Sequence, residues 1–226
     1  MKKILVAILG FAAIGTVSSC KKDDNSTPTT AKMMFFNGTV AAANVDGTIN
    51  SAKVSSASNI AYLNKTGYVD VATGGVSVGY LLTITQTSLV NNAENLAVSK
   101  YYSAFAGGIV TKPSLVFTSD DLSAPSANMA KIRLVNLSPD SLNEAMYIGT
   151  NNNPIVQNVG PQTASDFSET AAGTVKITLQ DPSKPTQQVT IASQNLAAGK
   201  IYTIVLTGSA VSTGNSVLTA NVVNNN

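Results

Sequence analysis

Few side chains in this sequence could do chemistry. The 226 residues include no histidine and one cysteine, Cys20. Without imidazole, the chain lacks the most common general base and the most common metal ligand in proteins. If Cys20 is used for another purpose, no thiol nucleophile, zinc–thiolate site or disulfide remains. We therefore predict no catalytic residues, no metal site and no cofactor, and we expect a protein that is not an enzyme.

One acidic pair, Asp120-Asp121, falls in the part of the chain that we expect to fold. Two neighbouring carboxylates can bind Ca²⁺ or act in acid–base catalysis. This pair lies in a polar run, residues 118–123, that leads into a proline-containing segment. A solvated charged loop is the interpretation that this context favours.

Ser138-Pro139-Asp140-Ser141 is the best-marked short motif. Proline fixes φ, and the flanking Asp and Ser can hydrogen-bond the backbone, so the motif predicts a turn. The alternative is a small polar ligand bound at the end of a strand. Asp140-Ser141-Leu142 also resembles the O-glycosylation motif of Bacteroidetes, which makes Ser141 a candidate O-glycosylation site.

Tyrosines are the remaining groups that could contact a ligand. The first half of the chain carries five of the seven. A tyrosine ring has an apolar face and a polar tip, and such rings are common where proteins bind partners. The candidate ligand contacts are Tyr62, Tyr68 and Tyr80, which a sugar-binding protein would hold exposed and coplanar. The alternative is that these rings fill the interior of strands.

Cys20 follows a segment typical of a secretory signal. Residues 1–19 combine a basic start, an apolar stretch from Ile4 to Val17 and small residues before the cysteine. The apolar stretch is short for a membrane span, which needs about 20 residues. The pattern resembles the bacterial lipobox, in which the thiol is acylated and becomes the mature N-terminus. We expect Cys20 to be the lipid-attachment residue through which the protein reaches a membrane.

The residues behind Cys20 indicate a location. Lys21, Lys22, Asp23 and Asp24 resemble the export signal of Bacteroidetes lipoproteins, which implies a lipid anchor in the outer membrane and a protein that faces the cell exterior. The alternative is a solvated charged linker. Residues 20–30 are polar as a whole and predict a flexible tether.

Net charge excludes nucleic acid as a partner. Two of the 14 basic side chains, Lys2 and Lys3, leave with the signal, so 12 basic and 12 acidic side chains remain. A neutral chain of this kind offers no basic patch to a phosphate backbone.

The rest of the sequence repeats itself at an offset of 99 to 100 residues. Residues 31–37, 74–78 and 95–102 match residues 130–136, 173–177 and 195–202 in the same order. Ordered matches at a nearly constant offset indicate two tandem domains. We assign residues 31–124 to the first domain and residues 125–226 to the second, with a proline-containing joint between them.

Polar and apolar residues alternate in both domains. The pattern at 174–179 points Val175, Ile177 and Leu179 to one face, and Ile132 and Leu134 share a face in the same way. Further strands are predicted at 188–191, 201–206 and 216–223. Short strands separated by frequent turns predict an all-β chain with two tandem antiparallel β-sandwich domains, immunoglobulin-like or transthyretin-like in shape.

The second domain resembles the DUF4397 family. Residues 131–140, 171–177 and 195–206 follow the family's R-x-x-N-x-S-P-D-A start, its ag-Y-t-v middle and its L-x-a-G-k-x-Y-T-v end. The first domain is a divergent copy, because Asn37-Gly38-Thr39 stands where the second has Asn136-Leu137-Ser138-Pro139. The family is a domain of unknown function found in secreted and surface proteins. The resemblance therefore implies a fold and a location, and it implies no catalytic residues.

These observations favour a non-enzymatic lipoprotein of the cell surface. We expect it to bind a glycan or a protein partner, or to act as a spacer. The first alternative is a purely structural subunit of a surface assembly. A carbohydrate-active enzyme is the least favoured alternative, because no spacing of residues supports it.

Overall fold

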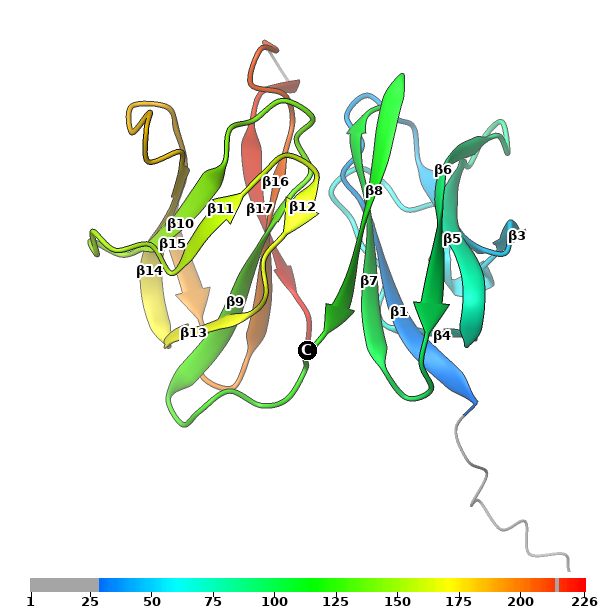
Figure 1. Cartoon of the computed structure of the whole chain (residues 1–226), viewed down its shortest axis with the longest axis horizontal. Helices are drawn as coiled ribbons and strands as arrows, with labels where there is room; N and C mark the ends of the chain where they lie inside the picture. The colour runs from blue at the N-terminus through cyan, green and yellow to red at the C-terminus, as the bar shows by residue number, and fades with distance from the viewer. Residues whose placement is uncertain (1–28, 214–215) are drawn as a thin grey trace, which may run out of the picture.

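The computed structural model describes residues 29–213 and 216–226, in which the chain is all-β (Figure 1). The named helical element is a short 3₁₀ turn, η1 (Ser55–Ala57). In the described ranges no helix has the length and apolar character to cross a membrane. The predicted fold class is confirmed. The predicted signal, Cys20 and the segment from Lys21 to Asp24 lie outside the described residues.

The first half of the described chain forms two four-stranded sheets, with the orders β4-β1-β7-β8 and β3-β2-β5-β6. The strands are β1 (Thr30–Asn37), β2 (Val45–Ile49), β3 (Ala52–Lys53), β4 (Val69–Ala72), β5 (Gly74–Leu82), β6 (Ser88–Leu96), β7 (Tyr101–Ile109) and β8 (Lys112–Asp120).

The second half repeats this arrangement. One sheet has the order β12-β9-β16-β17, with β13 also paired to β9, and the other has the order β11-β10-β14-β15. The strands are β9 (Met129–Asn136), β10 (Glu144–Ile148), β11 (Val156–Val159), β12 (Thr163–Ala164), β13 (Ser168–Ala171), β14 (Gly173–Gln180), β15 (Gln188–Leu196), β16 (Ile201–Thr207) and β17 (Thr219–Asn224).

The named strands pair antiparallel, with one exception in each half. β1 runs parallel to β7, and β9 runs parallel to β16. Parallel neighbours need a long crossover connection, and here the rest of each half supplies it. Equivalent pairs have equivalent registers: Met33 pairs with Tyr102 as Ile132 pairs with Tyr202. The repeat seen in the sequence is therefore a repeat of structure.

The two halves differ most between their last two strands. A tight turn joins β7 to β8, in which Ile109 pairs with Lys112. In the second half β16 ends at Thr207 and β17 begins at Thr219, so a longer connection joins them. We call its described residues, 208–213 and 216–218, the extra loop. The strand predicted at 216–223 starts later than expected because this loop includes its first residues.

Each half has its own apolar core between its two sheets. In the first half Met33 and Phe35 of β1 face Val76, Val78 and Tyr80 of β5. In the second half the corresponding core includes the side chains that alternation predicted to point inward: Ile132, Leu134, Ile177 and Leu179. Burial of one such side chain is worth about 1.5–3 kcal/mol.

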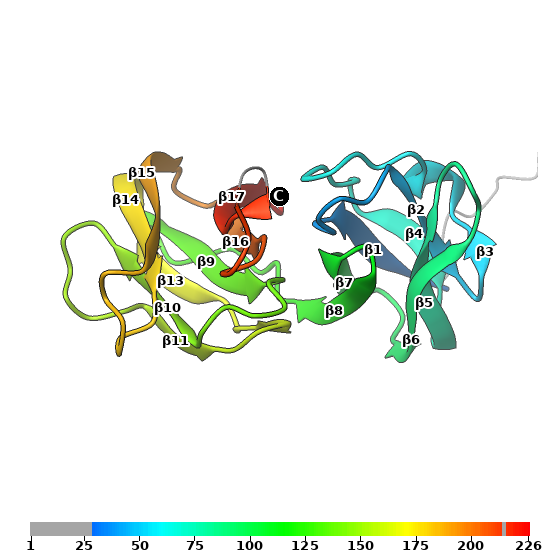
Figure 2. The same ribbon diagram turned by 90° about the horizontal axis from the view of Figure 1, so that it is seen from above.

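A third core lies between the two halves. Figure 2 shows the two halves side by side, with β7 and β8 of the first toward β16 and β17 of the second. The sheet that contains β1, β7 and β8 packs its outer face against the outer face of the sheet that contains β9, β16 and β17. We call this contact the junction. Its buried apolar residues are Met34, Phe36, Phe105, Val116, Val135, Leu137, Val205 and Val223.

Candidate functional site

Tyr80 is a core residue, and the expectation that it contacts a ligand is wrong. Its side chain is 1% exposed. The hydroxyl donates to the carbonyl of Ala104 at 2.6 Å and accepts from the backbone N–H of Phe36 at 3.0 Å. Burial raises its pKa far above the usual value for tyrosine. The hydroxyl is therefore a fixed neutral group inside the first sandwich.

Tyr62 and Tyr68 both reach across the junction. Tyr62 donates to the hydroxyl of Thr207 at 3.3 Å, and Tyr68 accepts from the side-chain amide of Asn225 at 3.1 Å. Both tyrosines are half-buried. Together with the buried Tyr80, they do not form the exposed coplanar platform that a sugar-binding surface needs. The structure brings two of the three candidate tyrosines to the second half of this same chain.

Ser141 is 5% exposed, which corrects its candidacy for O-glycosylation. Its hydroxyl donates to Asn136 at 3.1 Å and accepts from the amide of the same residue at 2.8 Å. A glycosyltransferase needs access to this oxygen, and the folded chain gives none.

Asp120 is the buried centre of the junction, so the interpretation of Asp120-Asp121 as a solvated pair is wrong for its first member. The carboxylate is 2.7 Å from Nη1 of Arg133. It also accepts hydrogen bonds from Tyr68 and Ser103 at 2.5 Å and from Thr118 at 3.0 Å. With four donors around it, the charge is fully compensated, as a buried carboxylate must be.

Arg133 carries the opposite charge from the second half. The residue is 1% exposed, and its Nε donates to the hydroxyl of Thr203 at 2.9 Å. Its guanidinium lies over the ring of Phe167 at 4.3 Å and near that of Phe105 at 5.6 Å. Nη2 has no hydrogen-bond partner among the described residues. The aromatic face of Phe167 lies against the guanidinium and stabilises its charge.

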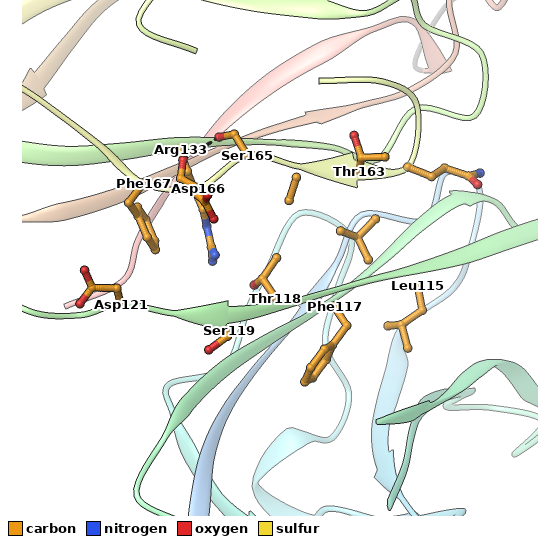
Figure 3. Close-up of a pocket in the computed structure, with 13 residues that line it drawn as sticks. Leu115, Phe117, Thr118, Ser119, Asp121, Arg133, Thr163, Ser165, Asp166 and Phe167 are labelled. Atoms are coloured by element: carbon orange, nitrogen blue, oxygen red, sulfur yellow. Dashed lines mark hydrogen bonds between the residues drawn. The ribbon is translucent and has the colours of Figure 1, made fainter. Parts of the chain in front are cut away.

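A cleft of about 590 Å³ opens beside Arg133, between β8 and residues 162–167 (Figure 3). Thr118 and Ser119 lie on one wall, and Ser165 and Phe167 on the other. Asp121, at one end, pairs with Lys131 at 2.8 Å. The hydrogen bond from Lys131 lowers the pKa of Asp121 well below its usual value.

The cleft is part of the junction, and two of its charged groups, Asp121 and Arg133, are already paired within the chain. Asp120 is bonded to Arg133, and Asp121 to Lys131. Over residues 29–213 and 216–226, no three His, Cys, Asp or Glu side chains gather as metal ligands. The arrangement stabilises contact between the halves, and that is the role that its geometry supports.

Asp140 of the Ser-Pro-Asp motif holds the extra loop of the second half. Its Oδ2 accepts from the hydroxyl of Ser209 at 2.6 Å, and its Oδ1 accepts from the backbone N–H of Ala210 at 2.8 Å. Burial opposes ionisation, but these hydrogen bonds outweigh it and hold the pKa of Asp140 below its usual value. The motif forms the predicted turn and also fixes residues 209 and 210.

Sequence reasoning missed the junction, although a signal for it exists. Met33-Met34-Phe35-Phe36 and Ile204-Val205-Leu206 are continuous apolar runs. Such runs are typical of strands that are buried on both faces. All four residues of the first run are fully buried.

Comparison with protein families gives one match. The model described as "Domain of unknown function (DUF4397)" matches residues 31–143 and 143–226, as two adjacent segments. The segments meet at residue 143, whereas the sheets divide between β8 and β9.

A search of curated proteins finds no match. Among solved structures, the chain is similar to a "putative cell adhesion protein" from Bacteroides uniformis at 9% identity, with a TM-score of 0.28. That likeness covers 88% of this chain and 98% of the other.

Proposed function

This chain belongs to the DUF4397 family, and from that premise we propose that it is a non-enzymatic lipoprotein of the cell surface. Cys20 carries the lipid, and the segment from Lys21 to Asp24 directs the protein to the outer face of the outer membrane. The two domains then present one end of the folded block to a glycan or protein partner.

The observation that carries this proposal is the common direction of the central strands in the two packed domains. The chain enters β1 at the lower edge of Figure 1. Because β1, β7, β9 and β16 all run the same way, the turns that follow them lie at the opposite, upper edge. A tether at the lower edge leaves these turns farthest from the membrane. We call the upper edge the distal end.

The first test concerns the anchor. In the full chain expressed in a Bacteroidetes host, Cys20→Ser should abolish incorporation of an alkyne-labelled fatty acid, because the acylated sulfur is removed. Labelling is read on the purified protein, together with its partition into detergent. Label retained by Cys20→Ser would contradict the lipid attachment.

A matched control separates anchoring from export. Replacing Lys21, Lys22, Asp23 and Asp24 by alanine should keep the lipid but protect the protein from protease added to intact cells. Equal protease sensitivity of this variant and the wild type would contradict the export role.

The second test concerns the partner. The chain without its signal is applied to arrays of glycans and matrix proteins, beside a variant in which the short β7–β8 turn replaces residues 208–218. Binding that the variant loses would support a partner at the distal end. A chain that binds nothing on either array would instead favour the alternative, a structural subunit.

A further inference from the structure

A second cavity, of about 340 Å³, lies at the distal end of the second half. The β14–β15 hairpin forms one side, and the other is formed by residues of the extra loop: Ser209, Ala210, Ser212, Val217 and Leu218. The hairpin and the described part of this loop lie at the top of the left-hand half in Figure 1. Half of its lining is apolar: Leu142, Leu179, Val189, Ala210, Val217 and Leu218. Among the described residues that line it, Glu144 and Asp181 are the charged ones, and both are acidic. We call it the acidic cavity.

Glu144 is a buried carboxylate that points into the acidic cavity. It lies on β10 in the same alternation as Met146 and Ile148, whose side chains belong to the core of this half. Its side chain is 6% exposed. No hydrogen bond or ion pair joins its carboxylate to any other described residue, and its oxygens open onto the cavity instead of being fully enclosed. A buried acid without a partner costs free energy, so such a group in a folded protein requires an explanation.

The equivalent position in the first half is apolar. Glu144 corresponds to Val45, which is fully buried. Val45 pairs with Leu82 across β2 and β5. In the second half Ala145 pairs with Gln180, so the next position in this register puts Glu144 opposite Asp181. An apolar cross-strand pair has thus been replaced by two carboxylates, and like charges placed opposite each other destabilise a sheet.

Three differences between the copies converge on the acidic cavity. The first is the carboxylate pair, the second is the extra loop, and the third is the Ser-Pro-Asp turn, whose Asp140 holds Ser209 and Ala210 of that loop. Each feature is absent from the first half. Residues that weaken a fold and meet at one cavity are expected where a protein binds a ligand.

We propose that the acidic cavity binds a primary ammonium group on an aliphatic stem, as on a lysine side chain of a partner protein. The ammonium pairs with Glu144 and Asp181, and the stem packs on Leu179, Val189 and Leu218. The proposal rests on the proposed function for the source of its ligand, and it deepens that function by naming the chemistry of the partner.

The lining fits an alkyl ammonium better than a divalent cation. Ca²⁺ takes six to eight oxygen ligands. The charged ligands here are two carboxylates, the other polar side chains of the lining are those of Gln187, Gln188, Ser209 and Ser212, and half of the lining is apolar. A lysine side chain buries its methylene stem on apolar surface and pairs its charged end with acids. The geometry therefore matches both parts of such a side chain.

The test is an NMR titration of the chain without its signal, carrying Cys20→Ser. n-Butylammonium chloride at millimolar concentrations should shift the backbone amides of Glu144, Leu179, Ser209 and Leu218. n-Butanol, which has the same stem without the charge, should not. Glu144→Gln should weaken the interaction at least tenfold, while Glu94→Gln, a loss of charge in the first half, should leave it unchanged.

Stability separates a loss of binding from a loss of fold. Glu144→Gln and Glu144→Val should keep the dispersed spectrum and raise Tm, because each removes a carboxylate that faces Asp181. If Glu144→Gln binds butylammonium as the wild type does, the proposal is overturned. The proposal is also overturned if butylammonium causes no shift up to about 50 mM, which would mean a dissociation constant well above the millimolar range. A third contrary result is that Ca²⁺ shifts these amides and butylammonium does not.

These outcomes are independent of the proposed function. If Glu144→Gln binds an array partner as tightly as the wild type does, the surface-binding role stands and the acidic cavity has no part in it. A silent array beside a clear butylammonium response would do the reverse.

Discussion

Arg133 of the second half and Asp120 of the first form a buried ion pair that joins the two copies of the domain. The equivalent residues of the opposite halves form no such pair. Arg133 corresponds to Met34 in the first half, and Asp120 corresponds to Asn225 in the second by strand register. A buried pair of this kind gives little net stability compared with apolar residues, but breaking it is costly because one charge stays buried. Its clearest effect is to specify which faces meet.

Arg133→Met should destabilise the chain by about 3–5 kcal/mol, since Asp120 stays buried without its cation. Urea denaturation followed by circular dichroism gives the free energy of unfolding. The double variant Arg133→Met/Asp120→Asn should recover most of the loss, because no unpaired charge remains. A single variant as stable as the wild type would show that water already screens the pair.

Glu144 should make stability fall as pH rises from 5 to 8. Burial, and then the charge of Asp181, raise its pKa to about 7. The folded state therefore holds a proton that the unfolded state releases near pH 4.5. The contribution to the free energy of unfolding is complete below the pKa of the unfolded state and is lost as the pH rises to the pKa of the folded state. The loss is on the order of 2 kcal/mol.

The surroundings of Glu144 make this a clean measurement. The charged groups near the acidic cavity are Asp181 and Lys184 on the hairpin and Asp140 on the motif turn, while residues 208–218 contribute none. The sequence has no histidine, so few other groups titrate in this window. Chemical denaturation at each pH is the measurement. Glu144→Gln should flatten the profile, and an unchanged slope would assign it to another group.

At the scale of strands, the sequence predicted the sandwiches but not how they pack. Alternation identified the inward face of β14 and of β9, because a half-buried strand has a period of two residues. It could not show that Lys131 and Arg133, on the other face of β9, would also be buried. That depends on a second sheet about 100 residues away. The acidic cavity was missed for a similar reason, because Glu144 and Asp181 become neighbours only through the pairing of β10 and β14.

Close approach at the junction also depends on glycine. A Cβ on Gly107 of β7 would lie 2.9 Å from Cβ of Leu137, which belongs to the other half. The next residue, Gly108, donates its N–H to the carbonyl of Leu137 at 3.0 Å. Backbone and side chain therefore meet here without a gap.

Gly107→Ala should destabilise the chain by about 1–3 kcal/mol, because the added methyl group forces β7 and Leu137 apart. Thermal unfolding gives the difference. Gly75→Ala is the matched control, since a Cβ there would have no heavy atom within 4 Å. Equal effects of the two substitutions would mean that the junction yields without cost.

At the scale of the whole molecule, the third core makes two domains behave as one folding unit. Apolar contacts, the ion pair and a backbone hydrogen bond all cross the junction. The segment between β8 and β9 is tied as well, because Lys131 bonds to both Asp121 and Ser123. Domains joined in this way should not move independently.

Calorimetry should show a single unfolding transition whose calorimetric and van't Hoff enthalpies agree. Placing charges in the junction, with Val135→Asp and Val205→Asp together, should divide it into two transitions, since each sandwich keeps its own core. Two transitions in the wild-type chain would contradict the rigid block.

The face-to-face arrangement of the copies has a consequence for assembly. Equivalent residues, Phe36 with Val135 and Phe105 with Val205, meet in one core, which is how the subunits of a symmetric homodimer meet. The junction therefore resembles the interface of a homodimer, held within one chain. With Asp120 on one copy and Arg133 on the other, two first copies or two second copies would each bury an uncompensated charge. Selection of the unlike partner is thus encoded in the chain, and each copy is free to diverge at its distal end without losing its neighbour.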